Sequence, residues 1–310
     1  MLDVMNKEQI FADLKHVLAP ESVLRLNESL AKKTTLRVGG PADVYVEPAS
    51  ERDLARLFRF CLQADIPFTV LGRGSNLLIR DGGIRGVVVR LAHKNFSDIK
   101  VSGPYLKCGA GASLKEVCNI ARQNGLAGLE FLGGIPGSVG GAMRMNAGAM
   151  GSATFERIEQ ISYMDREGEI HDVFVTQIEV YYRTCPMLRT HIALSAIFRG
   201  DPDSKEAIVA RTNNFNERRW NSQPKEPSAG CIFKNPEKIP AGKLVQELGL
   251  KGKQIGGAIV SPVHGNFIVN EKNATAADVL QLIEFIREKV KAERGIELET
   301  EVEILGEDPE

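Results

Sequence analysis

Residues 133–151 read GGIPGSVGGAMRMNAGAMG and hold seven of the chain's 30 glycines but only one charged side chain, Arg144. Glycine lets a backbone approach a ligand closely and turn its N–H groups toward it, because no side chain stands in the way. A flexible linker is the alternative, but Ile135, Val139 and Met143 make the stretch too apolar for a solvated spacer. We therefore interpret it as a wall for a large, flat, phosphate-bearing cofactor.

A second glycine loop precedes this stretch. The apolar residues 68–71 run into residues 72–76, which read GRGSN, and a further apolar segment follows at residues 77–79. A strand, a glycine turn with successive N–H donors and a return strand would suit a pyrophosphate. The loop has neither the G-x-G-x-x-G spacing and following helix of a dinucleotide fingerprint nor the pattern of a Walker loop. Alone it could be a plain hairpin turn; the two loops together indicate one cofactor held between two small αβ lobes.

Composition restricts the class of protein. The chain has 310 residues, is 43% hydrophobic and 25% charged, and carries 39 basic against 40 acidic residues, a net charge of −1. Such a chain buries a sizeable core and divides into two or three lobes, and it has no basic block to grip nucleic acid or an anionic membrane. No apolar run approaches the roughly 18 residues that cross a bilayer, and acidic residues lie close to Met1. We expect a cytoplasmic protein.

The cysteines and histidines do not predict a metal site. The five cysteines are scattered and form no C-x-x-C pair, and the five histidines show no ligand spacing such as H-E-x-x-H. Most of the cysteines are expected to be small buried hydrophobic residues.

Hydrophobic periodicity predicts a mixture of helices and strands. An amphipathic helix opens the chain, two helices start at Ser50 and Ser113, a polar helix runs through Trp220, and a long helix spans residues 275–293. Short β-branched runs predict the strands. They lie at residues 43–46, 68–71, 77–79, 87–91, 99–101, 158–164, 192–198, 231–233, 258–260, 267–269 and 298–305.

The two loops, followed by Met145-Asn146-Ala147-Gly148, resemble the FAD-binding domain of the p-cresol methylhydroxylase type and, more narrowly, the UDP-N-acetylenolpyruvoylglucosamine reductase family. The resemblance extends from about Thr35 to Gly306. It implies an α+β fold in which a two-lobed FAD-binding domain precedes a smaller α+β substrate domain. The expected boundaries are residues 1–34 for a lead-in, 35–200 for the FAD-binding domain, with lobes of about 35–93 and 94–200, and 201–310 for the substrate domain.

The resemblance also implies the reaction and its cofactors. The family reduces UDP-N-acetylglucosamine enolpyruvate to UDP-N-acetylmuramate in peptidoglycan synthesis, with hydride passing from NADPH to FAD and then to the substrate. No histidine lies in the GRGSN loop, so the FAD is expected to be non-covalent, and the protein is expected to be a monomer. The cofactor-binding positions carried over are Gly72, Arg73, Gly74, Ser75, Asn76, Gly134, Pro136, Gly137, Ser138, Gly140, Asn146 and Ala147. Asn235 is the expected substrate-binding residue.

By resemblance, Arg183, Cys231 and Glu301 occupy the three catalytic positions. Reduction of an enolpyruvyl ether needs a cation beside the carboxylate, where negative charge develops, and an acid that protonates the neighbouring carbon. An arginine stays protonated and grips a carboxylate at two points, which suits the first role. From the residues alone, Arg183 would be interpreted as an ordinary surface arginine beside Arg189.

The proton-donor position departs from the family, which usually has serine where this chain has Cys231. A thiol, with an ordinary pKa of about 8.5, releases a proton far more readily than an alcohol and is also easier to oxidise. A buried structural cysteine is the alternative. On a regular final strand Glu301 would share a face with Glu299 and Glu303, which is typical of a solvated face. Many relatives have arginine at position 303, so contacts there are open.

Two other functions remain open. The FAD domain could serve an oxidase or dehydrogenase of another substrate, because a fold does not determine a function. The exchange of serine for cysteine could also mark a catalytically silent nucleotide-binding protein, although Arg183 and Glu301 both match the family. The short spacing from Arg183 to the strand at residues 192–198 favours the subgroup that lacks a tyrosine-bearing closing loop.

Overall fold

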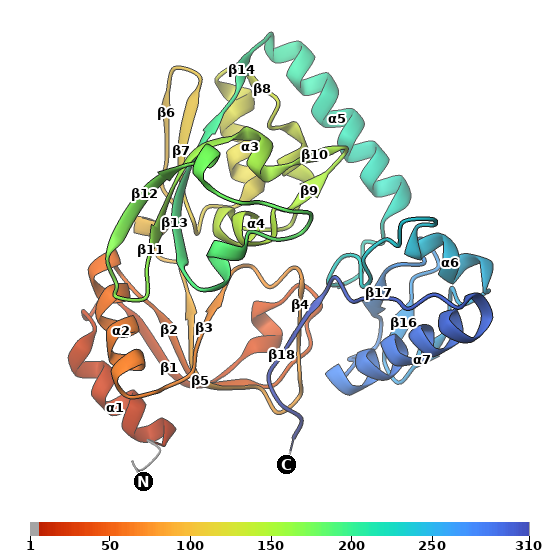
Figure 1. Ribbon diagram of the computed structural model, residues 1–310, viewed down its shortest axis with the longest axis horizontal. Coiled ribbons are helices and arrows are strands. Elements are labelled where there is room, and N and C mark those ends of the chain that lie inside the picture. Colours follow the sequence, from red (N-terminus) through yellow and green to blue (C-terminus); the bar gives the residue numbers. More distant parts are fainter. Residues whose placement is uncertain (1–5, 310) are drawn as a thin grey trace. The chain divides into compact units, whose positions relative to one another are not determined.

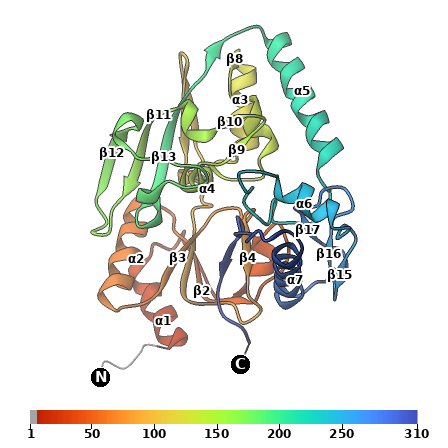
Figure 2. The same ribbon diagram turned by 45° about the vertical axis from the view of Figure 1, so that its right-hand side comes forward.

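The structure, a computed structural model, describes residues 6–309 and divides into two compact units (Figures 1 and 2). Of the described residues, unit 1 contains 6–26, 44–73 and 86–218, and unit 2 contains 27–43, 74–85 and 219–309. Each unit is thus assembled from three separate stretches of the chain.

Unit 1 contains two main sheets. The first is antiparallel, with the strand order β12-β11-β13-β7-β6 (Figure 1). Its strands are β6 (Ile99–Ser102), β7 (Tyr105–Gly109), β11 (Ile158–Met164), β12 (Ile170–Phe174) and β13 (Ile192–Arg199). The second sheet has the order β1-β2-β5-β3, with β3 and β5 parallel and most of its residues in unit 1. Its strands are β1 (Val23–Ser29), β2 (Pro41–Glu47), β3 (Phe68–Leu71) and β5 (Ile84–Arg90).

Two helices of unit 1, α2 and α3, start at the predicted caps Ser50 and Ser113. The Ser50 hydroxyl accepts the Asp53 N–H at 3.1 Å, and the Ser113 hydroxyl accepts the Glu116 N–H at 3.2 Å. Each bond satisfies an N–H that the first helical turn leaves unpaired. The helices are α1 (Lys7–Val17), α2 (Glu51–Gln63), α3 (Leu114–Gln123), α4 (Val139–Met145) and α5 (Lys205–Ser222), the last with its final residues in unit 2. Two short strand pairs complete the unit: β8 (Leu126–Ala127) with β14 (Asp201–Pro202), and β9 (Gly148–Ala149) with β10 (Ser152–Ala153).

Unit 2 is a small α+β arrangement around one apolar core. Strands β15 (Gln254–Ile255), β16 (Ala258–Val260) and β17 (Ile268–Asn270) form an antiparallel sheet, and β4 (Leu77–Ile79) pairs in parallel with β18 (Glu303–Leu305). The helices are α6 (Ala241–Glu247) and α7 (Ala276–Arg294). A capping box between Thr275 and Asp278 begins α7, and Gly295, with φ of +65°, ends it.

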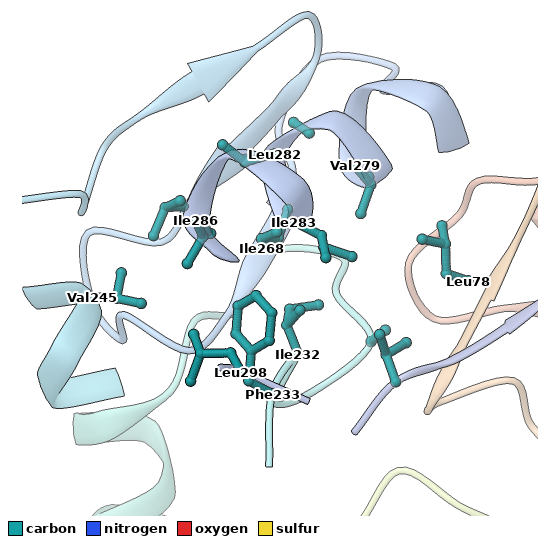
Figure 3. Packing of buried hydrophobic residues seen from close by; sticks show 14 of the residues in the cluster. Leu78, Ile232, Phe233, Val245, Ile268, Val279, Leu282, Ile283, Ile286 and Leu298 are labelled. Carbon is teal, nitrogen blue, oxygen red and sulfur yellow. The ribbon is translucent and has the colours of Figure 1, made fainter. Parts of the chain in front are cut away.

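One face of α7 supplies much of the core of unit 2. Val279, Ile283 and Ile286 are each at most 3% exposed, and Figure 3 shows them around Ile232 and Phe233. The latter two side chains are each 1% exposed, so the main chain beside Cys231 is anchored by buried apolar groups.

Of two strands predicted in unit 2, one is wrong and the other is present only in part. Residues 231–233 form no regular strand. Phe233 makes only an isolated antiparallel bridge to Thr300 on one side, and on the other side the Ile232 N–H donates to the Asn266 carbonyl and the Phe233 N–H to the Asn266 side chain. The predicted strand at residues 298–305 is regular only in β18. The N–H groups of Glu301 and Val302 both approach the Ile232 carbonyl, which breaks the alternating ladder.

The expected return strand after residues 72–76 is not found. The strands on either side of these residues are both present but do not pair with each other, since β3 pairs with β5 and β4 pairs with β18. The segment at residues 77–79 is therefore not a return strand, and the loop is a connection between two sheets rather than a hairpin turn. Within residues 6–309 none of the helices has the length and apolar character needed to span a bilayer.

Candidate functional site

The first glycine loop offers a row of backbone donors. Within residues 6–309, the N–H groups of Arg73, Gly74, Ser75 and Asn76 donate to no protein acceptor. Gly74 has φ of +63°, and a Cβ there would lie 2.5 Å from the Lys33 carbonyl oxygen, so only glycine fits. Successive backbone N–H groups in such a turn form an anion-binding concavity. The loop therefore suits the diphosphate of a nucleotide cofactor.

In unit 1 the beginning of this loop lies against the long glycine stretch. A Cβ at Gly72 would be 3.1 Å from Oγ of Ser138, and one at Gly140 would be 3.0 Å from Cβ of Ala110. Ser138 itself caps α4, because its Oγ accepts the Gly141 N–H at 3.4 Å. The two loops thus lie against each other at Gly72 and Ser138, and a Cβ at Gly72 or Gly140 would be crowded.

The other predicted cofactor positions of unit 1 follow one another before and after α4. Gly134 ends a 3₁₀ turn, Pro136 and Gly137 connect that turn to Ser138, and Ala147 follows the helix. The Gly137 N–H donates to the Ile135 carbonyl at 2.8 Å, and the Ala147 N–H donates to the Ala142 carbonyl at 2.9 Å. These two donors are already used within the protein.

Asn146 connects the glycine stretch to the turn that carries Arg183. It lies at the C-terminal end of α4 in the left-handed conformation, with φ of 41°. Its Nδ2 donates to the Tyr181 carbonyl at 3.2 Å, and its Oδ1 accepts the Phe155 N–H at 3.2 Å. Its side chain therefore ties two neighbouring segments of unit 1 to the helix end.

Arg183 occupies a tight turn on the glycine stretch. Tyr181 and Thr184 exchange backbone hydrogen bonds of 2.9 and 3.2 Å, and Arg183 between them has φ of 59°. Its Nη1 lies 3.3 Å from the position that a Cβ on Gly148 would take, and its guanidinium lies 4.8 Å from the centroid of the Tyr182 ring. Within unit 1, Arg183 is thus brought to the same glycine stretch as the predicted cofactor residues.

In unit 2 the Cys231 segment lies beside the second half of the first loop. Gly230 has φ of +75°, and a Cβ there would be 3.9 Å from the Ser75 carbonyl oxygen. Thr35 links the two segments: its N–H donates to the Gly74 carbonyl at 3.1 Å and its hydroxyl to the Ser228 carbonyl at 2.7 Å. The linking role of Thr35 was not predicted, because no sequence motif includes this residue.

Cys231 differs from the other cysteines. Cys61, Cys108, Cys118 and Cys185 are buried, as predicted, and burial raises the pKa of the Cys61 and Cys108 thiols to about 12. Cys231 is only partly buried. A thiol that reaches the surface of a site can exchange protons, whereas a thiol in an apolar core is inert.

The Glu301 segment is bonded directly to the Cys231 segment. The Glu301 N–H donates to the Ile232 carbonyl at 2.7 Å, and its own carbonyl accepts from Nδ2 of Asn76 at 2.9 Å. Unit 2 thus brings together Asn76, Cys231 and Glu301, three positions far apart in the sequence. The regular strand expected here is present only in β18, while Leu298 and Val302 are buried and Glu299, Glu301 and Glu303 are not, so the shared face of the three acids stays a prediction.

The side chains of Lys234 and Asn235, which follow Cys231, both bond to other residues of unit 2. Lys234 forms a 2.9 Å ion pair with Glu299, whose side chain is 75% exposed, and the lysine lowers the pKa of that carboxyl. The Oδ1 of Asn235 accepts the Ala241 N–H at 3.1 Å, which places this residue at the start of α6. Among residues 6–309 we find no group of three or more His, Cys, Asp or Glu side chains that could hold a metal ion.

Sequence reasoning also missed Asn266, which is 2% exposed and holds the main chain of Phe233 through its side chain. The available signal was a lone amide within the otherwise apolar residues 266–269. Buried polar side chains are almost always hydrogen-bonded, so such an amide indicates a specific partner.

Comparison with known proteins agrees with this geometry. Residues 42–173 match the model of an FAD-binding domain, and residues 223–305 match the model of the C-terminal domain of UDP-N-acetylenolpyruvoylglucosamine reductase. The reductase of Bradyrhizobium sp. (strain ORS 278) is 43% identical over 304 residues, which is 97% of this chain and 99% of that protein. The reductase of Geobacillus thermodenitrificans is 42% identical over 303 residues, again 97% and 99%.

The fold of a solved relative agrees as well. The crystal structure of the Thermus caldophilus UDP-N-acetylenolpyruvylglucosamine reductase superposes with a TM-score of 0.80 at 35% identity, and covers 92% of this chain and 99% of that one. The predicted α+β fold with an FAD-binding domain of the p-cresol methylhydroxylase type is confirmed. On these matches over nearly its whole length, the chain belongs to the UDP-N-acetylenolpyruvoylglucosamine reductase family.

Proposed function

We propose that this protein is an FAD-dependent oxidoreductase that uses NADPH to reduce UDP-N-acetylglucosamine enolpyruvate to UDP-N-acetylmuramate. The observation that carries the proposal is the 2.7 Å bond from the Glu301 N–H to the Ile232 carbonyl. It joins the residue that follows the expected proton donor, Cys231, to Glu301, which is expected to polarise the substrate or assist the protonation. The reaction needs such a pair beside the carbon that is protonated.

The residues present fit FAD. Four successive N–H groups without a protein acceptor, from Arg73 to Asn76, would hold the diphosphate, and the glycine stretch from Gly134 to Ala147 would hold the remainder. When bound, FAD supplies the redox step, by accepting hydride from NADPH and passing it to the alkene. The protein supplies binding, orientation and charge.

Arg183 would bind the carboxylate of the enolpyruvyl group. Negative charge develops on this carboxylate as hydride reaches the neighbouring alkene carbon, and a guanidinium can accept it through two hydrogen bonds. The turn at Tyr181 and Thr184 fixes the main chain on both sides of Arg183. Such a preformed donor costs little reorganisation during the reaction.

Cys231 would protonate the second alkene carbon from its Sγ–H, and the resulting thiolate would regain a proton from solvent. Glu301 would orient the substrate or assist this transfer. Asn235, at the start of α6, would contact the nucleotide part of the substrate. We also propose a cytoplasmic monomer of the subgroup without the closing loop, since only a 3₁₀ turn at Pro186–Arg189 separates Arg183 from β13. The domain limits at residues 34 and 200 remain part of the proposal.

Stopped-flow measurement of the two half-reactions tests the assignment. With Cys231→Ala, reduction of the flavin by NADPH should keep its rate, while reoxidation by the enolpyruvyl substrate should slow by about 10²- to 10⁴-fold, the usual contribution of a general acid. The matched variant Cys231→Ser, which restores the family's usual residue, should recover most of that rate.

Equal loss in both half-reactions would remove the proton-donor role from Cys231. A colourless protein that cannot be reconstituted with FAD would contradict the whole proposal. NADPH consumption that depends on oxygen rather than on the enolpyruvyl substrate would instead indicate an oxidase.

A further inference from the structure

A buried asparagine holds the main chain that follows Cys231. Asn266, 2% exposed, accepts the Phe233 N–H on Oδ1 at 2.9 Å and donates from Nδ2 to the Phe233 carbonyl at 2.8 Å. Its own carbonyl accepts the Ile232 N–H at 2.9 Å. All three bonds thus end on the two residues directly after Cys231.

The same main chain also sets the place of Glu301. The Ile232 carbonyl accepts the Glu301 N–H at 2.7 Å, so the peptide between Ile232 and Phe233 lies between Asn266 on one side and the Glu301 segment on the other. We infer that Asn266 is a positioning residue for the reaction, which fixes the main chain of the proton donor Cys231 relative to that of Glu301. This inference rests on the proposed function of Cys231 and Glu301.

The side-chain amide of Asn266 supplies the two hydrogen-bond partners that a neighbouring strand would otherwise give to Phe233. Phe233 makes only an isolated bridge to Thr300, and its own N–H and carbonyl both bond to the side chain of Asn266, which is buried with it. Asn266 is held in turn, because its N–H donates to Nδ1 of His264 at 3.1 Å. Without the side-chain amide, the Phe233 peptide would have to move to find other partners, and Cys231 would move with it.

The test uses the FAD-loaded enzyme and the variant Asn266→Ala. We expect reoxidation of the flavin by the enolpyruvyl substrate to slow by about 10- to 100-fold, the cost of misplacing a reacting group, while reduction by NADPH changes by less than about twofold. Alkylation of Cys231 by iodoacetamide should accelerate by at least about threefold, because a loosened main chain exposes the thiol. The other four cysteines are buried, so the label reports on this position.

Asn270→Ala is the matched control. Asn270 ends β17, four residues after Asn266, and also makes bonds through both side-chain atoms, to the Leu36 carbonyl at 3.1 Å and from the Ala274 N–H at 2.9 Å. Neither of these two side-chain bonds is to residues 231–233, and its bond to the Pro227 carbonyl comes from the backbone N–H, which alanine keeps. This variant should lose stability without changing either the substrate half-reaction or the alkylation rate.

A second variant decides the matter if Asn266→Ala does not fold. In Asn266→Asp the protonated carboxyl offers one donor and one acceptor, as the amide does, whereas the ionised carboxylate only accepts. Its substrate half-reaction, relative to wild type at the same pH, should therefore decline as the pH rises. A ratio that does not change with pH would overturn the inference.

Parallel measurement of Cys231→Ala separates this inference from the proposed function. If Cys231→Ala spares the substrate step, the proposed function of Cys231 is wrong and this inference falls with it. If Cys231→Ala abolishes that step but Asn266→Ala behaves like Asn270→Ala, the inference about Asn266 alone is overturned.

Discussion

Asn146 should stabilise unit 1 and hold the turn of Arg183 at the same time. Its side chain makes two hydrogen bonds of 3.2 Å, to the Tyr181 carbonyl and from the Phe155 N–H, and its backbone has φ of 41°. Asn146→Gly removes both bonds but keeps a residue at ease in this conformation. Asn146→Ala removes the bonds and also places a Cβ where it is strained.

The magnitudes follow from these contacts. One part-buried hydrogen bond, from the Phe155 N–H, and one exposed bond, to the Tyr181 carbonyl, at about 1 kcal/mol each give a loss of at most about 2 kcal/mol in the free energy of unfolding for Asn146→Gly. The strained backbone adds about 1 kcal/mol, so Asn146→Ala should lose at most about 3 kcal/mol. Asn273→Ala measures the strain alone, because Asn273 has φ of 52° and its exposed side chain has no hydrogen bond within the described residues; we expect about 1 kcal/mol there.

Urea unfolding of the FAD-free protein, followed by circular dichroism, measures these differences. With FAD restored and its content checked, reoxidation by the substrate should slow by about tenfold in Asn146→Gly, because the Tyr181–Thr184 turn loses one tether. Wild-type stability together with a wild-type rate in Asn146→Gly would refute the argument that this side chain holds the turn. Equal stability of the Gly and Ala variants would refute the argument from strain.

Three further changes should affect stability, each measured by urea unfolding. Gly74→Ala should cost at least about 2 kcal/mol, because φ is +63° and a Cβ would lie 2.5 Å from a carbonyl oxygen, whereas Gly252→Ala, in open space, should cost only the strain. Arg211→Ala should cost about 3 kcal/mol, because it leaves the Glu130 carboxylate, 5% exposed, without its 2.8 Å ion pair; adding Glu130→Gln should recover part of this loss. Burial lowers the pKa of His264, so the unfolded chain binds its proton more readily; stability should fall as the pH drops below about 6.5, and His264→Gln should flatten this decline.

Local chemistry explains what the sequence predicts well. The caps at Ser50 and Ser113 depend on a hydroxyl and an N–H three residues later, so both can be read from neighbouring residues. The glycine positions are also local, since a positive φ or a close approach leaves no other choice, as at Gly74.

The unpredicted parts of the site depend on contacts between distant residues. Ile232 and Phe233 favour a strand by their own preference, but on one side of the segment the partners are the side-chain amide and the carbonyl of Asn266 rather than a strand. A side chain that bonds the main chain of a distant segment, as Asn266 does, produces no hydrophobic periodicity by which the sequence could reveal it. The connection between β3 and β4 is similar: each segment is a strand, but their partners, β5 and β18, could not be read from the loop itself.

The chain before β18 is irregular at Glu301, which is less exposed than Glu299. On a regular strand Glu299, Glu301 and Glu303 would share one face and one environment. Because the Ile232 carbonyl receives the N–H groups of both Glu301 and Val302, the alternating hydrogen-bond ladder is broken at this point. Glu299 is a surface carboxylate, while Glu301 is partly buried beside the Cys231 segment. The two departures from the predicted strands in unit 2 therefore meet at the peptide of Ile232, and they coincide with the two residues to which we assign the acid chemistry.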